Sequence, residues 1–326
     1  MDKVYRFLSK VVGISSDDRG SDVMMKSSRA LIAAYAAIGT VKFLWKYLRP
    51  FPQLKTMYGG TWAVISGATG GIGLRIAHEL AAHGVHIILM ARNVQGLTAT
   101  ATDLRSKYGI ETREISFDAE SDIDVSRIGE DICDLPISLL FNNVGVHNEV
   151  PTSIEDMEGE EIKRIVTVNC IFQAKLASAV IPLMKKYISM KSSKARNPCI
   201  INVSSLTSRM AMPLLSVYAA TKAFEEHLTT GLAAELLPSG IHVMCLRPGL
   251  TVSSMSGETV PSLFCPSAED MAHACLHKID CGELCVVPYA PHAFLDIINK
   301  FVPDRLTWSI VLKMHEEKRE KMLKKQ

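Results

Sequence analysis

A tyrosine and a lysine four residues apart are the residues of this chain best suited to acid–base chemistry. Tyr218 and Lys222 stand at i and i+4 in the segment YAATK, a spacing that places both side chains on one face of a helix. A free phenol titrates near about 10, so bringing it to about 7 needs roughly 4 kcal/mol of preferential phenolate stabilisation, which a neighbouring ammonium helps to supply. The pair is therefore suited to holding and delivering a proton.

The same spacing occurs a second time, at Tyr187 and Lys191, so the spacing alone is not specific. The residues upstream separate the two pairs. Ser205 stands thirteen residues before Tyr218, at the end of the apolar run CIINVS, whereas Ala174, thirteen before Tyr187, lies inside a predicted helix. A serine hydroxyl at a strand end favours the pair at Tyr218 as the catalytic one.

A glycine-rich turn at residues 67–73 indicates a second function, the binding of a dinucleotide. The turn, GATGGIG, follows the apolar run WAVIS and precedes a helical pattern. Glycines let a diphosphate approach the backbone closely, and the helix N-terminus offers unpaired N–H groups and the positive end of the helix dipole. This strand–turn–helix context is the one that the motif requires. The residues of the turn expected at the cofactor are Gly67, Gly71, Ile72 and Gly73.

The end of the second apolar run predicts which dinucleotide is bound. In proteins that bind NAD, an acidic residue about 20 positions after the glycines takes the ribose 2′-hydroxyl. This chain has Ala91-Arg92-Asn93 there, with no carboxylate in the segment. A guanidinium can pair with a 2′-phosphate, so Arg92 predicts NADP(H) rather than NAD(H). The alternative is an arginine that simply lies exposed at a strand end.

The elements that must position these residues follow from the hydrophobic pattern. Short apolar and β-branched runs alternate with longer segments of helical period between Trp62 and Val287. Near-continuous apolar runs indicate strands buried on both faces, so the pattern predicts an α/β fold, a Rossmann-type doubly wound parallel sheet of about seven strands. The predicted strands are residues 62–66, 85–90, 114–117, 137–141, 199–204, 241–246 and 284–287.

Length and composition limit the classes of function. The chain has 326 residues, enough for one large α/β domain with additions. We expect an N-terminal segment over residues 1–59, a catalytic domain over 60–290 and a helical, basic tail over 291–326. Lys plus Arg number 36 against 34 for Asp plus Glu, a balance that argues against a nucleic-acid partner. A hydrophobic content of 48% excludes a disordered chain.

The N-terminal segment is apolar enough to contact a membrane. Residues 30–41 are uncharged and mostly apolar, and the run reaches Leu48 only by including Lys42 and Lys46. A span over residues 30–48 requires those lysines to extend toward the head groups. The alternatives are a helix lying on the membrane surface and a helix that caps the domain. The stretch 307–325 offers a second basic amphipathic helix, either on a membrane or in solvent.

We expect no metal site. His273, His277, Cys281 and Cys285 follow one another at intervals of four, but Gly282 interrupts the helical period and Cys285 begins an apolar strand. Four such side chains would not converge on a tetrahedral metal. The chain has eight cysteines and no CxxC pair, which predicts free thiols in a reducing compartment.

The order and spacing of these motifs resemble those of the short-chain dehydrogenases/reductases, over about residues 60–290. The matching segments are SGATGGIG (66–73), NNVG (142–145), VTVNC with Asn169, VSS (203–205), YAATK (218–222) and RPG (247–249). Three segments are similar in sequence to the membrane-bound branch of the family, which contains very-long-chain 3-oxoacyl-CoA reductases and 17β-hydroxysteroid dehydrogenases. They are YGGTWAVISGATGGIG, MPLLSVYAATK and VPDRLTWSIVLKMHEEKR.

The resemblance implies a role for each matching residue. Tyr218 would donate the proton to a carbonyl oxygen, and Ser205 would bind that oxygen of the substrate by a hydrogen bond. Lys222 would hold the nicotinamide ribose and favour the phenolate, and Asn169 would anchor the water that resupplies the proton. The residues implied around the cofactor are Asn142, Gly145, Asp118, Pro248, Gly249 and Ser253, the last standing where the family usually has Thr.

Some features depart from the branch. Gly70 stands where a charged residue is common, so the turn adds no cofactor selectivity. Arg247-Pro248-Gly249 is closer to the wider family than to the Pro-aromatic pair of the branch. The polar segment 189–198 is a longer insertion than expected, and Lys324 and Lys325 are one place off the dilysine retrieval pattern.

The function that the resemblance implies is an NADP(H)-dependent oxidoreductase acting on CH–OH and C=O groups. We expect reduction of a lipophilic carbonyl, first a long-chain 3-oxoacyl-CoA in fatty-acid elongation. The alternatives are a keto-steroid, a retinol or other short-chain alcohol, and a catalytically silent scaffold. The branch implies the endoplasmic reticulum membrane with the active site facing the cytosol, with peripheral attachment from the cytoplasm as the alternative, and the helices beside the site could pair subunits in a homodimer.

Overall fold

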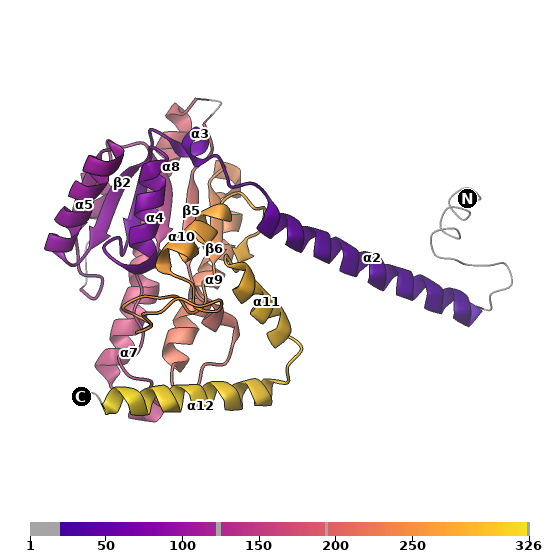
Figure 1. The fold of residues 1–326 in the computed structure, drawn as a ribbon. Helices are drawn as coiled ribbons and strands as arrows, with labels where there is room; N and C mark the ends of the chain where they lie inside the picture. Colours follow the sequence, from indigo (N-terminus) through magenta and orange to yellow (C-terminus); the bar gives the residue numbers. More distant parts are fainter. Residues whose placement is uncertain (1–19, 122–124, 193–194, 325–326) are drawn as a thin grey trace, which may run out of the picture. The chain divides into compact units, whose positions relative to one another are not determined.

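The computed structural model describes residues 20–121, 125–192 and 195–324 and divides into two compact units, residues 1–51 and 52–326 (Figure 1). The described part of the first unit is dominated by one long helix, α2 (Gly20–Leu48). From Met25 onward its large apolar side chains are exposed, among them Leu31, Ile32, Tyr35 and Trp45. Among residues 25–48, whose side chains the structure describes, none is buried.

The second unit contains a single sheet, and all seven predicted strands are confirmed. Their order is β3-β2-β1-β4-β5-β6-β7, and every neighbouring pair is parallel. The order reverses between β1 and β4, which is the position where doubly wound sheets bind ligands. The strands are β1 (Trp62–Ser66), β2 (His86–Ala91), β3 (Thr112–Ser116), β4 (Ile137–Asn142), β5 (Cys199–Val203), β6 (His242–Leu246) and β7 (Cys285–Val286).

Helices cover both faces of the sheet (Figure 1). On one face α4 (Gly71–Ala82) packs against α5 (Val94–Tyr108) and α10 (Ala268–His277). On the other face α6 (Val125–Asp131) packs against α8 (Gln173–Met190), and α9 (Ser216–Leu236) packs on β5 and β6. This two-sided cover is why the central strands read as continuous apolar runs.

The remaining elements connect or flank these layers. A single π-helical turn, η2 (Thr167–Phe172), joins α7 (Gly159–Val166) to α8. The core beneath it includes the stacked rings of Phe117 and Phe172, whose centroids are 4.6 Å apart. The other helices and turns are α3 (Leu54–Tyr58), η1 (Ile154–Asp156), η3 (Leu206–Arg209), η4 (Leu237–Ser239), α11 (Ala290–Asn299) and α12 (Asp304–Leu323).

The helix α12 lies against loops at the carboxyl edge of the sheet. His315 Nδ1 donates to the carbonyl oxygen of Pro213 at 2.6 Å, and Lys318 Nζ donates to that of Ser256 at 3.1 Å. Arg319 Nη2 lies 3.9 Å from Asp156 Oδ2. The C-terminal helix therefore packs against the rest of the second unit along this edge.

The polar insertion is partly helical. Its first two residues, Ser189 and Met190, end α8, and Cys199 begins β5 directly after it. Ser193 and Lys194 lie outside the described residues, as does Lys325 of the expected retrieval pattern.

Candidate active site

The residues expected to perform the chemistry lie at the carboxyl ends of the parallel strands. Ser205 follows β5 and begins the turn η3, and α9 packs against that turn. Tyr218 is half-buried in the first turn of α9, and Lys222 is buried one turn further along. The Lys222 Nζ lies 5.8 Å from the centre of the Tyr218 ring. The structure thus brings a hydroxyl, a phenol and an ammonium to one edge of the sheet.

Lys222 is held by two acceptors. Its Nζ donates to the carbonyl oxygen of Val203 at 3.0 Å and to Glu225 Oε1 at 2.8 Å. Burial lowers the pKa of Lys222, but interactions with Glu225 and Tyr218 together raise it more, so the pKa lies above its ordinary value. The side chain is therefore an ammonium at neutral pH, as stabilisation of a phenolate requires.

Asn169 joins the loop after β4 to α9. Its Oδ1 accepts from the Val146 backbone N–H at 2.9 Å, and its Nδ2 donates to the Val146 carbonyl at 2.8 Å and to Thr221 Oγ1 at 2.9 Å. Thr221 Oγ1 in turn donates to the Tyr218 carbonyl at 2.7 Å. Both amide hydrogens are therefore used within the protein. A water that supplies protons at this point would have to form its hydrogen bond with the Asn169 backbone or with the remaining lone pair of the Asn169 side-chain oxygen.

The segment after β4 places a glycine beside Lys222. A Cβ on Gly145 would lie 3.2 Å from Lys222 Nζ, so a side chain here would press on the ammonium. Asn142, expected at the cofactor, is buried, and its Nδ2 donates to Asn202 Oδ1 at 2.9 Å. The next residue, Asn143, which the sequence did not single out, reaches the glycine turn and donates to the Ser66 carbonyl at 3.0 Å.

The glycine turn has the conformation that close binding of a diphosphate needs. Gly67 and Gly71 have φ of +70° and +52°, a region that L-residues with a Cβ adopt at a cost. The helix α4 begins at Gly71, so its unpaired N–H groups, including that of Ile72, face the turn. A Cβ on Gly73 would lie 2.5 Å from Asn143 Nδ2, and one on Gly71 would lie 3.8 Å from Ser253 Cβ. These residues fit a bound dinucleotide.

At the end of β2 the structure corrects one part of the sequence interpretation. Arg92 is at the predicted place and mostly exposed, but a carboxylate is present, because Glu120 from the loop after β3 folds back to it. Arg92 Nη1 lies 2.9 Å from Glu120 Oε1 and 4.0 Å from Asp118 Oδ1. Asp118, expected near the adenine, thus belongs to this cluster. A 2′-phosphate has to compete with Glu120 for the guanidinium.

The loop after β6 is fixed by a histidine that the sequence did not single out. The Gly249 N–H donates to His292 Nδ1 at 3.2 Å, and His292 Nε2 donates to the Phe264 carbonyl at 3.0 Å. Burial lowers the pKa of His292, although the Phe264 hydrogen bond opposes this effect. The neutral ring therefore accepts from one loop and donates to another. The preceding residue, Pro248, accepts from the Leu206 N–H at 3.0 Å, which joins this loop to the turn after Ser205.

A histidine lies beside the Tyr218 ring, and a residue with positive φ precedes Tyr218 by four positions. The ring of His147 lies edge-on to that of Tyr218 with centroids 5.9 Å apart, and His147 Nε2 donates to the Met255 carbonyl at 2.8 Å. Leu214, four residues before Tyr218, has φ of +65° and accepts from the Thr152 N–H at 2.9 Å. The hydrogen bond from Thr152 helps to hold Leu214 in this strained conformation.

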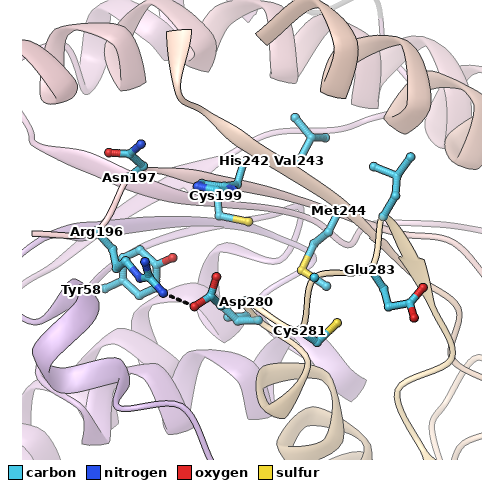
Figure 2. Close-up of a pocket in the computed structure, with 13 residues that line it drawn as sticks. Tyr58, Arg196, Asn197, Cys199, His242, Val243, Met244, Asp280, Cys281 and Glu283 are labelled. Atoms are coloured by element: carbon cyan, nitrogen blue, oxygen red, sulfur yellow. Dashed lines mark hydrogen bonds and ion pairs between the residues drawn. The ribbon is translucent and has the colours of Figure 1, made fainter. Parts of the chain in front are cut away.

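A separate cavity of about 310 Å³ lies at the opposite edge of the sheet, where β5 and β6 begin (Figure 2). An ion pair between Arg196 and Asp280 crosses it. Burial raises the pKa of the Tyr58 phenol and of the Cys199 thiol, so both groups are neutral at ordinary pH. This cavity does not contain the residues expected to be catalytic.

The histidines and cysteines that follow one another at intervals of four lie in different surroundings. His273 Nδ1 lies 2.7 Å from Glu79 Oε1 of α4, whereas Cys281 lines the cavity and Cys285 begins β7. Within the part of the chain that the structure describes, no group of three or more His, Cys, Asp or Glu side chains is arranged to hold a metal ion.

The parallel sheet, with a glycine turn at the point where its strand order reverses, defines a dinucleotide-binding α/β enzyme. The chain belongs to the short chain dehydrogenase family, whose model matches residues 61–263, and it is a nicotinamide-dependent oxidoreductase. It is similar to the very-long-chain 3-oxoacyl-CoA reductase of Podospora anserina, with 33% identity over 91% of this chain and 89% of the relative. The mouse protein of the same description is 30% identical over 82% and 83% of the two chains.

Solved structures agree with this assignment. A short-chain dehydrogenase from Sphingobium yanoikuyae in complex with NADPH is 27% identical and superposes with a TM-score of 0.62 over 74% of this chain and 94% of that one. A 7β-hydroxysteroid dehydrogenase is 21% identical with a TM-score of 0.69, over 79% of this chain and 98% of that one, and shows the shared fold.

Proposed function

We propose that this protein reduces a long-chain 3-oxoacyl-CoA to the 3-hydroxyacyl-CoA with NADPH, as a step of fatty-acid elongation. The observation that carries the proposal is the arrangement of Ser205, Tyr218 and Lys222 at the carboxyl edge of the sheet, beside a glycine turn that fits a dinucleotide. The substrate class is supported by relatives that share about a third of their residues along most of the chain and are described as very-long-chain 3-oxoacyl-CoA reductases.

The side chains of this site are suited to the proton half of a carbonyl reduction. A bound nicotinamide supplies the hydride that reaches the carbonyl carbon. Ser205 Oγ donates a hydrogen bond to the carbonyl oxygen, where negative charge develops, and the Tyr218 phenol delivers the proton to that oxygen. The Lys222 ammonium, 5.8 Å from the ring centre, stabilises the phenolate that remains.

NADPH is the proposed cofactor because of Arg92. Its guanidinium lies at the end of β2, where dinucleotide-binding folds place the ribose of the adenosine half. An arginine there offers two parallel N–H groups to a 2′-phosphate. The NADPH complex of the Sphingobium yanoikuyae relative supports this choice.

We propose that the protein is attached to the endoplasmic reticulum membrane with its catalytic unit in the cytosol. Within the described residues, the stretch Met25–Leu48 has 24 residues, is long and apolar enough to cross a membrane, and contains no buried residue. The second long apolar stretch, Gly159–Met190, runs through α7, η2 and α8, and buried side chains such as Ile165 and Val180 make it part of the enzyme core. Exposed apolar side chains also mark α11, the turn that follows it and the start of α12, namely Phe294, Leu295, Ile298, Phe301, Leu306, Trp308 and Ile310.

Membrane attachment is tested by alkaline carbonate extraction of the full chain and of a variant lacking residues 20–48. We expect the full chain to stay with the membrane pellet and the shortened one to be released in larger part. Protease added outside sealed vesicles should digest the catalytic unit of the full chain. Protection of that unit would contradict the proposed orientation.

The reaction is tested by NADPH oxidation with detergent-purified protein, a long-chain 3-oxoacyl-CoA and, in parallel, a 17-keto-steroid. We expect turnover of the acyl-CoA to exceed that of the steroid, and Tyr218→Phe to lower kcat by roughly 10²- to 10⁴-fold while NADPH still binds. Faster reduction of the steroid would make the alternative substrate class the correct one. A wild-type protein that does not bind NADPH would instead be a silent scaffold.

A further inference from the structure

A carboxylate is buried directly behind the catalytic lysine. Glu225 lies one helical turn beyond Lys222 on α9 and is 0% exposed. Its Oε1 accepts from Lys222 Nζ at 2.8 Å and from Gln173 Nε2 of α8 at 2.9 Å. Its Oε2 is buried without a hydrogen-bond partner among the described residues. An ionised carboxylate is rarely left half-satisfied in a protein interior, so this arrangement needs a physical reason.

The groups around Glu225 make it responsive to the charge of Lys222. Glu226 follows on the same helix, but its carboxylate is bound by Arg209 at 2.9 Å and lies 3.7 Å from Arg247. The thiols of Cys170 in η2 and Cys245 in β6 also face the Glu225 carboxylate, and burial is a cause of the raised pKa of each. Both thiols are therefore neutral. Lys222 is the cation in contact with Glu225.

The charge of Glu225 changes near neutral pH. Burial raises the pKa of Glu225 to about 7, because removal from water outweighs the attraction of Lys222 and the hydrogen bond from Gln173. Above that pH the carboxylate faces the Lys222 ammonium as an ion, and below it the pair carries the lysine charge alone. The electrostatic field that reaches Tyr218 therefore differs between the two states.

The hydrogen bonds of Lys222 show how the Glu225 carboxylate fixes the position of the ammonium. An ammonium has three hydrogens, and those directed to Val203 and Glu225 account for two of them. The third is not used by these two acceptors, and the centre of the Tyr218 ring lies 5.8 Å from Nζ. The two acceptors thus fix the position of the ammonium at this distance from the phenol.

We propose that Glu225 is a positioning residue for Lys222, which fixes the ammonium beside Tyr218 and offsets part of its charge. The ionised carboxylate weakens the positive field that the Lys222 ammonium exerts at the phenol. This inference rests on the proposed function, because the proton of Tyr218 matters for the reductive direction. Glu225 acts through Lys222 and does not itself contact the reacting atoms.

The test is the ionisation of Tyr218 in Glu225→Gln. The near-ultraviolet absorbance of the phenolate is followed against pH, and the signal of Tyr218 is isolated by subtracting the same protein carrying Tyr218→Phe. We expect the midpoint to fall by roughly half a pH unit or more, since the lysine charge is no longer offset. In NADPH oxidation assays the basic limb of the kcat profile moves the same way, with little change in KM.

Two further variants separate charge from structure. Glu235→Gln changes an exposed carboxylate on the same helix and should leave the midpoint in place. Glu225→Asp keeps the charge but withdraws it from Lys222, so it should preserve more of the wild-type midpoint than the glutamine does. It should also lower kcat, because the ammonium is held less firmly. An aspartate variant with the same midpoint as the glutamine variant would show that volume rather than charge matters, and would overturn the inference.

The absorbance titration needs no substrate, so the two proposals fail separately. A midpoint that does not move in Glu225→Gln overturns the inference even if the 3-oxoacyl-CoA is reduced. A midpoint that moves as expected, in a protein that reduces no 3-oxoacyl-CoA, supports the role of Glu225 and overturns the proposed substrate.

Discussion

Arg92 Nη1 lies 2.9 Å from Glu120 Oε1, so the guanidinium at the end of β2 is already paired with a carboxylate. Both side chains are partly exposed, and an ion pair in water contributes only about 0 to 1 kcal/mol. A phosphate dianion offers the guanidinium more charge and more acceptor oxygens than this carboxylate does. The pair therefore moderates binding of a 2′-phosphate without preventing it.

Substitutions of this pair should change NADPH affinity in opposite directions. Arg92→Leu removes charge-assisted hydrogen bonds and should weaken NADPH binding by roughly tenfold or more, with little effect on NADH. Glu120→Gln releases the guanidinium and should tighten NADPH binding by about two- to fivefold. Cofactor fluorescence titrations give both dissociation constants. An equal loss of NADPH and NADH affinity in Arg92→Leu would show that the arginine has a general structural role.

The sheet could be predicted from the sequence because its strands carry the strongest local signal. The central strands β1, β4 and β5 are buried at every position, so they appear as unbroken apolar runs. The strand β3 is half-exposed along TREIS, and its predicted start at Glu114 is two residues later than the observed start at Thr112. A parallel sheet then places the ends of β4 and β5 together, which brings Gly145 to Lys222.

The parts that could not be predicted depend on the paths of loops. Glu120 and His147 reach the site from loops with no pattern of their own, and His292 of α11 reaches it only because the path of the chain brings that helix to the loop after β6. Glu225 could have been noticed, since it follows Lys222 by three residues and faces the same side of the helix. Nothing in the sequence shows that this face is buried, and burial is what gives the carboxylate its effect.

Gly249 is packed so closely that an added methyl group should destabilise the fold. A Cβ there would lie 2.6 Å from His292 Nδ1 and 2.9 Å from Leu206 Cδ1, so Gly249→Ala should cost about 1 to 3 kcal/mol of unfolding free energy. At Gly231 on α9 an added methyl group would meet no atom within 4 Å, and Gly231→Ala should stabilise the helix by about 0.5 to 1 kcal/mol. Urea unfolding compares the two. A destabilised Gly231→Ala or a neutral Gly249→Ala would contradict this account.

His292 should make the enzyme less stable in acid. Its folded-state pKa lies below the ordinary value of 6.5, so the unfolded chain binds the proton more tightly. The stabilisation is present above that ordinary value and is lost as the pH falls through the folded-state pKa. Protonation would also turn His292 Nδ1 into a donor, so that it could no longer accept the hydrogen bond from the Gly249 N–H.

The measurement for this histidine is Tm against pH. His292→Asn should lower Tm at neutral pH but flatten its decline on the acid side. His227→Asn, which changes an exposed histidine of α9, should keep the wild-type slope. A slope in His292→Asn that matches wild type would assign the acid sensitivity to other groups.

The contact of α12 with Pro213 predicts that the C-terminal helix influences substrate use. His315 Nδ1 donates to the Pro213 carbonyl at 2.6 Å, next to Leu214 with its strained φ of +65° and five residues before Tyr218. His315→Ala removes about 1 kcal/mol of support, so kcat/KM for the carbonyl substrate should fall by roughly fivefold. NADPH affinity should be unchanged, because α12 supports the loops at Pro213, Ser256 and Asp156 and not the conformation of the glycine turn. The exposed Glu317→Gln on α12 serves as the control, and equal losses in the two variants, or a loss confined to NADPH binding, would contradict the prediction.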